Sequence, residues 1–271
     1  MALEISIRET TSVPLEVEGI LPETVRDKSL DEIRRLSIYH GNRQEQFGDY
    51  FDISGDPADE TMIWQGNLAG VHWLGTKMNG GVIRVEGDAG RHVGSEMRRG
   101  EIHVSGNASD WVGGEMHGGL IHIRGRAGHL VGAAYRGSPR GMTGGTILVH
   151  GSVGNELGHT MRRGLIAVGG DTGDLVGFNM LAGTILIFGE AGIRPGAGMH
   201  RGTLGFFGPS APPLLPSFRR ACRFQPDVLA LLASELRRLD FPLPDSFGSQ
   251  PINLFHGDMI EGGRGEVMIA S

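Results

Sequence analysis

Hydrophobic and polar residues alternate in short segments that recur at a fixed interval along most of this chain. Each segment reads apolar-x-apolar, followed by G-x-x-[GS]-x-x-x-G, then usually Met and Gly. Windows begin at residues 82, 101, 120, 146, 165 and 184, so the period is 19 residues, broken once by a 7-residue insertion. Alternation predicts one strand per window. A fixed period near 20 residues is typical of proteins that stack their repeats.

The apolar positions of stacked windows fall into three columns. Parallel strands stack about 4.8 Å apart, so equivalent side chains of successive windows lie over one another. Three inward columns per turn predict an all-β fold: a right-handed parallel β-helix, a single-stranded solenoid of 19-residue rungs, with α/β caps at both ends. The columns hold the strand residues such as Ile83, Ile102 and Ile121, the series from Val93 and Val112 to Pro195, and the methionines from Met97 and Met116 to Met199.

Glycines mark the predicted corners of each turn. Gly87 and Gly106 begin one series and Gly94 and Gly113 begin another. A tight corner needs positive φ or close approach of two backbones, and glycine permits both. A phosphate-binding loop is the alternative interpretation, but no window reads G-x-x-x-x-G-K-[ST], and such a loop occurs once per site before a helix. The glycines are therefore interpreted as structural.

The flanking segments predict the two caps. Residues 1–50 form the expected N-terminal cap, with a short helix over 29–36 that Ser29 and Glu32 begin as a capping box. Residues 51–208 form the expected β-helix, with 51–56 as an incomplete first turn. Each end of a β-helix exposes the edge of its terminal strand, and a cap is needed to cover that edge.

Residues 209–271 form the expected C-terminal cap. It has a predicted helix over 227–239, with Leu229, Leu232 and Leu236 on one face, and a terminal hairpin from 252–255 and 266–269. One outward column of the repeated strands turns from polar to apolar along the stack, and an apolar outer face must be covered. We expect the helix to cover it. That column reads Arg84, His103, His122, Leu148, Ala167, Leu186.

The polar part of that column carries the candidate functional residues. His103 and His122 are stacked in this column, and stacked histidines bind metals in some proteins. Leu148 ends the column before a third histidine, so no metal site is predicted. The 7-residue insertion is ejected from a regular coil, and such loops are frequent contact sites. The predicted partner-binding surface comprises Arg84, His103, His122, Arg124, Tyr135, Arg136 and Arg140.

A second candidate surface follows the methionine column at one corner. Arg98, Arg99, Arg162, Arg163 and Arg201 follow Met in their windows. Stacking predicts a basic ridge there, which is either a solvated edge or a docking site for an acidic partner or a polyanion. No G-x-S-x-G, C-x-x-C or H-E-x-x-H motif occurs. We therefore predict no catalytic residue in this chain.

Composition narrows the class of protein. The net charge of −6 argues against nucleic-acid binding, and Cys222 is the single cysteine, so no intrachain disulfide forms. No apolar run approaches the ~20 residues of a transmembrane helix, and residues 1–10 have no long apolar run of a signal peptide. A cytoplasmic location without membrane contact is the expectation. Only two of the 25 basic residues are Lys, which favours a bacterial genome rich in G and C.

The windows and the blocks beside them resemble known proteins over nearly the whole chain. The windows alone resemble the C-terminal β-helix domain of glutamate synthase. With the flanking blocks, the chain resembles more closely the family of the formylmethanofuran dehydrogenase C subunit, which includes the equivalent (gamma) component of the bacterial formyltransferase/hydrolase complex. The blocks are Val13–Gly19, His40–Asn42, Phe51–Gly55, Gly141–Gly145, Gly257–Asp258 and Gly263–Glu266.

The resemblance implies a scaffold role in one-carbon metabolism. The complex would move a formyl group from tetrahydromethanopterin to methanofuran or methylofuran and hydrolyse it to formate, with the metal and the chemistry in other subunits. The implied partners are a formyltransferase, an amidohydrolase-like subunit and a dehydrogenase-like subunit. This chain alone would bind no cofactor and show no turnover. A glutamate synthase-like scaffold and an independent β-helix enzyme are the alternatives.

Overall fold

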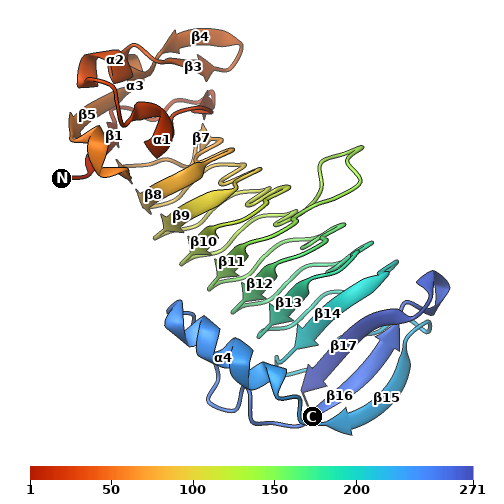
Figure 1. The fold of residues 1–271 in the computed structure, drawn as a ribbon. Helices are drawn as coiled ribbons and strands as arrows, with labels where there is room; N and C mark the ends of the chain where they lie inside the picture. The colour runs from red at the N-terminus through yellow and green to blue at the C-terminus, as the bar shows by residue number, and fades with distance from the viewer. Residues whose placement is uncertain (271) are drawn as a thin grey trace.

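The structure, a computed structural model, describes residues 1–270 and is mostly β (Figure 1). The helices are α1 (Pro22–Val25), α2 (Leu30–Arg34), α3 (Phe47–Tyr50) and α4 (Val228–Arg238), with 3-10 turns η1 (Pro57–Asp59) and η2 (Met259–Glu261). The strands are β1 (Leu3–Ile7), β2 (Leu15–Glu16), β3 (Ser37–His40), β4 (Arg43–Gln46), β5 (Phe51–Gly55), β6 (Thr61–Gln65), β7 (Val71–His72), β8 (Asn79–Glu86), β9 (Arg99–Val104), β10 (Leu120–Ile123), β11 (Thr146–Val149), β12 (Leu165–Val168), β13 (Thr184–Ile187), β14 (Arg201–Phe206), β15 (Arg219–Phe224), β16 (Ile252–Gly257) and β17 (Arg264–Ala270).

Thirteen strands form one large mixed sheet. Its order is β15-β16-β17-β14-β13-β12-β11-β10-β9-β8-β6-β1-β5. From β6 to β14 each strand pairs in parallel with the strand of the next window, whereas β1 with β5 and β15 with β16 are antiparallel pairs. A second sheet has the order β4-β3-β2-β7. The repeats therefore add strands in sequence order. The terminal segments join this sheet through the parallel pairs β1 with β6 and β17 with β14, and their remaining strands continue it in antiparallel pairs.

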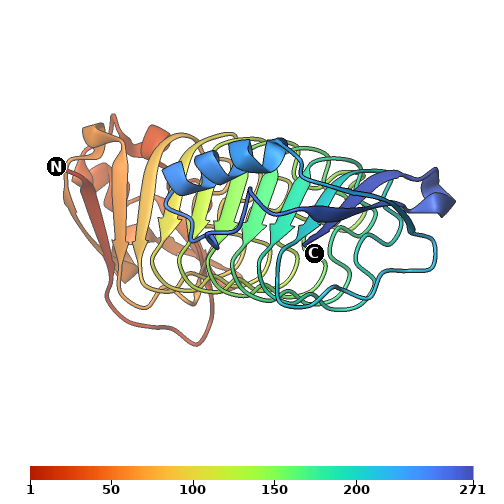
Figure 2. The ribbon, with the colours of Figure 1, turned by 90° about the horizontal axis from the view of Figure 1, so that it is seen from below.

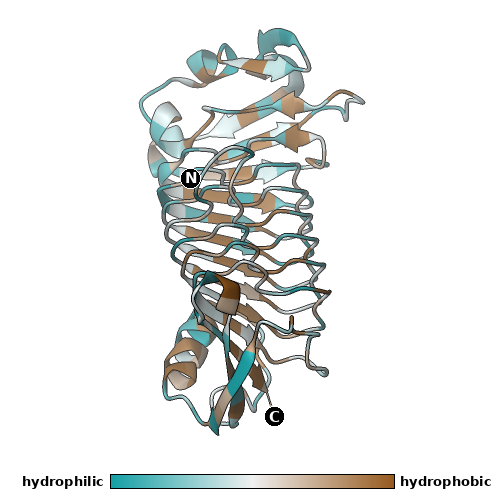
Figure 3. Cartoon of the chain, turned by 90° about the vertical axis from the view of Figure 1, so that its right-hand side faces the viewer, coloured by the Kyte–Doolittle hydropathy of each residue, from teal (hydrophilic) through white to brown (hydrophobic). Residues whose placement is uncertain are grey.

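The register of the parallel strands follows the repeat. Ile121 lies opposite Ile102 and Ile147 on its two neighbouring strands. Ile121, Val112 and Met116 each have 0% exposure, so the three columns predicted from the period point inward. Figure 3 shows the result as hydrophobic segments that recur level after level along the stack. Because equivalent side chains contact one another, the core is continuous along the stack rather than divided by window.

The two glycine series meet two different needs. Gly94 and Gly113 have φ of 64° and 61°, the left-handed region that side chains rarely adopt. Gly106 is not left-handed, but a Cβ there would lie 2.6 Å from the backbone of Gly87 in the preceding turn. One corner therefore needs glycine for its dihedral angles and the other for the close approach of two backbones.

Polar side chains bind the backbone of the following turn at two corners. Oδ1 of Asp88 accepts from the backbone N–H of Asn107 at 2.6 Å, and Oδ1 of Asn107 accepts from the backbone N–H of Arg126 at 2.9 Å. His129 takes part in a parallel series, where its Nδ1 accepts from the N–H of Asn155 at 2.9 Å. These bonds satisfy backbone groups that lie between strands, where no ladder partner exists.

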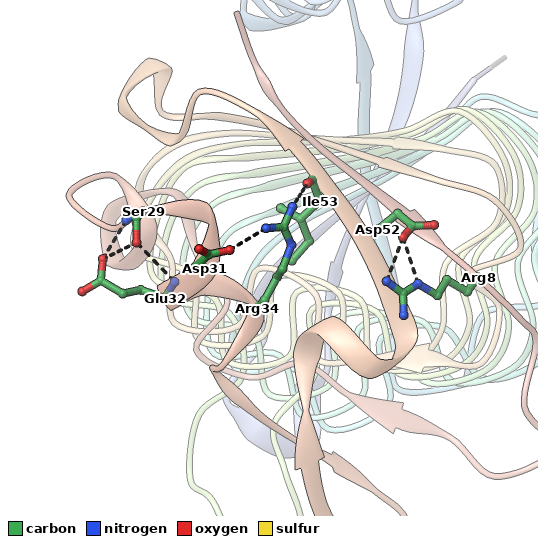
Figure 4. A network of polar contacts seen from close by, with 7 residues as sticks. All are labelled: Arg8, Ser29, Asp31, Glu32, Arg34, Asp52 and Ile53. Atoms are coloured by element: carbon green, nitrogen blue, oxygen red, sulfur yellow. Dashed lines mark hydrogen bonds and ion pairs between the residues drawn. The ribbon is translucent and has the colours of Figure 1, made fainter.

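The N-terminal segment closes one end of the large sheet with its own strands. The predicted capping box is present, with Glu32 N–H donating to Ser29 Oγ and the Glu32 carboxylate accepting from Ser29 (Figure 4). The prediction that residues 51–56 are an incomplete first turn was wrong. β5 pairs only with β1, antiparallel, because β1 occupies the position next to β6. The α2 helix is shorter than the predicted 29–36, and the β3–β4 hairpin was not predicted.

The C-terminal segment covers the apolar part of the outer face, as predicted. Helix α4 lies across successive strands in Figure 2, and its buried residues are Leu229, Ala233 and Leu236. Leu232 is only partly buried, so the stripe is rotated from the predicted one. The predicted hairpin is present as β16 and β17, which extend the predicted strands, whereas β15 was not predicted. The helix shares a hydrophobic cluster with Leu148, Ala167 and Leu186 on the strands and with Phe188 and Phe207 just after β13 and β14.

No helix within residues 1–270 is long and apolar enough to cross a bilayer.

Candidate functional site

Three histidines gather where the outer column changes from polar to apolar. His103 on β9 and His122 on β10 are adjacent in the sheet, with ring centroids 6.0 Å apart. His150 follows β11, and its Nε2 lies 2.7 Å from Nε2 of His122. His122 is 2% exposed. Burial first, and then the charges of Arg124 and His150, lower the pKa of His122 to about 4.

The hydrogen bonds assign the proton positions of this cluster. Arg124 Nη1 lies 3.4 Å from Nε2 of His150, and a guanidinium can only donate. His150 Nε2 is therefore the acceptor for both neighbours, and His122 carries its proton on Nε2 and donates it. Burial also lowers the pKa of His150. Both rings are thus neutral at physiological pH, and the pair forms a buried hydrogen bond without a net charge.

Arg124 ties this cluster to the C-terminal segment. Its Nη2 lies 2.8 Å from Oδ2 of Asp240, and its Nη1 donates to the Asp240 carbonyl oxygen at 3.2 Å. The hydrogen bond and charge of Arg124 lower the pKa of the Asp240 carboxyl. Phe241 packs edge-on against His150, with centroids 5.5 Å apart. The end of the α4 segment is therefore held on the residues that directly follow β10 and β11 by polar and aromatic contacts.

A shallow depression of about 270 Å³ lies on the early strands next to this tie. Its walls include Arg84, Glu86, His103, Ser105 and Arg124. His103 Nε2 lies 2.9 Å from the Glu101 carboxylate, whereas Arg84 is exposed and forms no ion pair within the described residues. Of the four residues predicted on this face, Arg84 and His103 are open to a partner. His122 is buried and Arg124 is paired with Asp240, so the C-terminal segment covers this face from an earlier turn than predicted.

A stack of aromatic rings lines another corner of the same turns. Trp73 and His92 stack with centroids 3.8 Å apart and planes 2° apart, His92 and Trp111 are 6.1 Å apart, and Trp111 and Tyr135 are 4.7 Å apart. Trp73, His92 and Trp111 all have φ between 63° and 66°, because this corner is left-handed in every turn. Burial lowers the pKa of His92 to about 4. The sequence interpretation missed this stack.

The inserted loop starts on that stack. The Tyr135 hydroxyl donates to Ser95 Oγ at 2.8 Å and lies 3.0 Å from Nδ1 of His92, and burial raises the pKa of Tyr135 to about 12. The Tyr135 ring is therefore an anchor of the loop within this chain, whereas Arg136 and Arg140 are exposed. The loop overhangs a cavity of about 300 Å³ whose walls include Trp111, Tyr135, Glu156 and His159. The loop projects from the stack in Figure 1.

The predicted basic ridge is interrupted. All five arginines are exposed, and none forms an ion pair with a carboxylate of residues 1–270. Hydrogen bonds from one turn to the next place His117 and Thr143 between Arg98 and Arg162, and Leu181 follows Arg162. The nearby glutamates have other partners: Glu96 lies 4.0 Å from Lys77, and Glu156 pairs with His159. The ridge is thus two separate arginine pairs and a terminal Arg201.

The histidine cluster, the aromatic stack and the arginine pairs are suited to packing within the chain or to contact with a partner. Within the part of the chain that the structure describes, no group of three or more His, Cys, Asp or Glu side chains is arranged to hold a metal ion. The histidine pair and the aromatic stack were missed because their partners come from different turns. The signal available in the sequence was positional: Trp73, His92 and Trp111 occupy equivalent positions of successive windows.

The fold and these surfaces define a repeat protein of stacked parallel strands with a covered outer face. No family model matches the chain. It is 42% identical over 90 residues to the C subunit of the tungsten-containing formylmethanofuran dehydrogenase 2 of Methanothermobacter thermautotrophicus, and 43% identical over 79 residues to the C subunit of the molybdenum-containing formylmethanofuran dehydrogenase 1 of the same organism. These matches cover 32% and 29% of this chain, and the chain spans only 33% and 20% of the length of those curated relatives.

A solved structure extends the similarity to the full chain. A chain of the formyltransferase/hydrolase complex (FhcABCD) from Methylorubrum extorquens, determined in complex with methylofuran, superposes with a TM-score of 0.90 at 31% identity. The superposition covers 99% of each chain. The protein therefore belongs to the family of formylmethanofuran dehydrogenase C subunits.

Proposed function

We propose that this chain is the non-catalytic scaffold subunit of a formyltransferase/hydrolase complex in tetrahydromethanopterin-linked one-carbon metabolism. The observation that carries the proposal is the full-length similarity to a chain of such a complex, with a TM-score of 0.90 over 99% of both chains. The complex would transfer a formyl group from formyl-tetrahydromethanopterin to methanofuran or methylofuran and then release formate. Metal and cofactors would be held in other subunits, and the complex would act in the cytoplasm.

We propose for the chain the β-helix with a cap at each end that the sequence predicts. The stacked turns form a right-handed parallel β-helix that lies within the predicted span 51–208 and begins after β5, between an N-terminal cap that includes β5 and the predicted C-terminal cap over 209–271. Parallel in-register pairing at the strands supports this, as do bridges between successive turns at a second corner, such as Ala89 with Ala108 and Val153 with Thr172. A rigid rod of this kind suits a scaffold because each turn presents a different surface at a fixed spacing.

The partners would be a formyltransferase, an amidohydrolase-like subunit and a dehydrogenase-like subunit. Arg84 and His103 on the early strands, together with Arg136 and Arg140 of the inserted loop, are the proposed contact residues, because all four reach the surface. Arg and aromatic residues are enriched in interface hot spots. Tyr135 holds the loop in place from beneath, which lowers the entropy that the loop loses when it binds.

The experiment has two arms. Co-purification of the tagged chain from its own organism should recover the three subunits, and formate release from a formylated furan cofactor should require all of them. The isolated chain should show no turnover. Recovery of the chain alone, or of a glutaminase-like partner, would contradict the proposal, and turnover by the isolated chain would refute its non-catalytic part.

The loop has its own test. Arg136→Ala combined with Arg140→Ala should weaken assembly of the complex by about 2 kcal/mol or more if the loop is a hot spot. The matched control is Arg35→Ala with Arg43→Ala, which removes two exposed arginines from the N-terminal segment. Equal assembly of both double variants across a dilution series would place the contact elsewhere, and the arginine pairs at 98–99 and 162–163 would be tested next.

A further inference from the structure

The last strand of the large sheet has an open edge. β15 pairs with β16 on one side, and it is the terminal strand of the sheet order, so its other side has no strand neighbour within residues 1–270 (Figure 1). All six residues of β15 are exposed. A free edge presents unpaired N–H and C=O groups, which are a template for an additional strand.

The opposite end of the same sheet is closed. There the edge strand β5 buries Phe51 and Ile53, and α2 and α3 pack against it. Arg34 Nη2 donates to the Ile53 carbonyl oxygen at 2.9 Å, and Arg8 binds the Asp52 carboxylate (Figure 4). The chain thus protects one edge with its own side chains and leaves the other without cover. Because β15 buries neither of its faces, backbone pairing to β16 is its main attachment.

The side chains of β15 carry a concentrated positive charge. Arg219, Arg220 and Arg223 form no ion pair with any carboxylate of the described residues, although the chain as a whole has a net charge of −6. Arg219 donates to the Pro216 carbonyl oxygen and Arg220 to Asn253 Oδ1, at 2.8 and 2.9 Å. Three guanidinium groups without a carboxylate partner, all within six residues, attract carboxylates from outside.

A shift in the register between β15 and β16 determines which side chains of β15 lie on the same face of the sheet. The pairing with β16 shifts between Arg220 and Cys222, so Ala221 has no opposite residue. Arg220 and Arg223 therefore share one face, opposite Phe255 and Asn253, while Arg219, Cys222 and Phe224 share the other. Phe224 is 39% exposed and is followed by Val228 and Leu231, which are 46% and 72% exposed on α4. The face of Arg220 and Arg223 thus carries two cations, and the opposite face carries Arg219 together with the exposed Phe224.

We propose that β15 binds an extended acidic segment of a neighbouring subunit, which adds a strand to this edge. Main-chain hydrogen bonds would supply affinity, and carboxylates facing Arg220 and Arg223 would supply specificity. A second copy of this chain is a poor occupant because two such strands would bring their arginines together. This inference rests on the proposed function, since it requires that the chain works within a complex of different subunits.

The single cysteine provides the first measurement. Cys222 is exposed in the isolated chain, and no other cysteine of this chain contributes to its alkylation. The rate of reaction of Cys222 with iodoacetamide is measured in the free chain and in the co-purified complex, with the labelled peptide quantified by mass spectrometry. We expect the rate to fall at least tenfold in the complex, because an added strand covers the edge.

Charge reversal provides the second measurement. Arg220→Glu with Arg223→Glu should weaken association of this chain with the remaining subunits at least tenfold, while its own melting temperature stays within a few degrees because both side chains are exposed. Arg35→Glu with Arg43→Glu changes the net charge equally at the far end of the stack and should associate as the natural chain does. Association of the natural chain should also weaken as salt rises.

The outcomes separate the two proposals. If the natural chain forms the complex, but Cys222 reacts equally fast in it and the β15 variant assembles normally, the docking proposal is wrong and the arginines only protect a solvated edge from aggregation. If the natural chain forms no complex with other subunits, the proposed function and this inference are both overturned.

Discussion

The Nε2 atoms of His122 and His150 lie 2.7 Å apart on neighbouring turns, and His122 has only 2% of its surface exposed. His122 is the last polar residue of an outward column that continues as Leu148. The pair therefore stands at the boundary between the open outer face and the part that α4 covers. Its neutral hydrogen bond is compatible with that burial, whereas a charged imidazolium beside Arg124 is not.

This arrangement predicts an acid-sensitive fold. The pKa of His122 is about 4 in the folded chain, against about 6.5 in an unfolded one. Between these values the unfolded state binds more protons, so stability should be constant above pH 6.5 and fall as the pH drops from 6.5 towards 4. The loss from His122 should reach at most ~3 kcal/mol. Urea unfolding at pH 7.5, 6, 5 and 4 measures it.

A variant isolates the contribution of His122. His122→Leu places at this position the residue type that Leu148 has one turn later. It should flatten the loss of stability between pH 6.5 and 4, while His92, whose pKa is also about 4, retains its own share. An unchanged pH profile in His122→Leu would show that the acid sensitivity arises elsewhere.

Core truncation should be costly in the turns. Ile121 has 0% exposure between Ile102 and Ile147. Ile121→Ala should destabilise the chain by about 2–5 kcal/mol, because it leaves a cavity in a continuous column. Leu231→Ala is the control, since Leu231 is 72% exposed on α4, and it should change stability by about 0.5 kcal/mol or less. Equal effects at the two positions would contradict the inward orientation of the column. Thermal and urea unfolding measure both.

The close approach of two turns can be tested at a glycine. A Cβ at Gly106 would lie 2.6 Å from the Gly87 backbone, which cannot move without separating two turns. Gly106→Ala should therefore destabilise the chain by about 1–3 kcal/mol. Gly80→Ala is matched, because a Cβ at Gly80 meets no atom within 4 Å. Calorimetry should show a lower melting temperature for Gly106→Ala only; similar values would refute the backbone contact.

The anchor of the inserted loop can be tested at one hydroxyl. Tyr135→Phe removes the hydrogen bonds to Ser95 and His92 and keeps the ring on Trp111. It should cost about 0.5–1.5 kcal/mol of folding stability. Tyr39→Phe, at a side chain that is 49% exposed, should have no measurable effect. Limited proteolysis should cut the loop faster in Tyr135→Phe than in Tyr39→Phe. Equal cleavage would mean that the hydroxyl does not hold the loop.

The repeat itself was readable from the sequence because its signal is local and periodic. The strand positions, the inward columns and the corner glycines follow from which residue types recur every 19 positions. The covering role of the helix near Asp227 follows from the outward column that changes from polar to apolar and from the apolar face of the helix itself. The family resemblance followed from the same windows together with their flanking blocks. Each turn buries its side chains against its copies, so the pattern of one window specifies the packing of all of them.

Tertiary structure alone decided how irregular segments meet the repeat. Phe51–Gly55 has the pattern of a repeat strand, but β1 arrives from the chain terminus and takes its place beside β6. Arg124 and Asp240 are 116 residues apart in sequence, and only their approach shows that the α4 segment reaches the polar turns. Tyr135 packs on Trp111 and His92 because the left-handed corners of earlier turns place those two rings side by side. In each of these contacts at least one partner lies outside the regular windows. The 19-residue period therefore does not predict the contact.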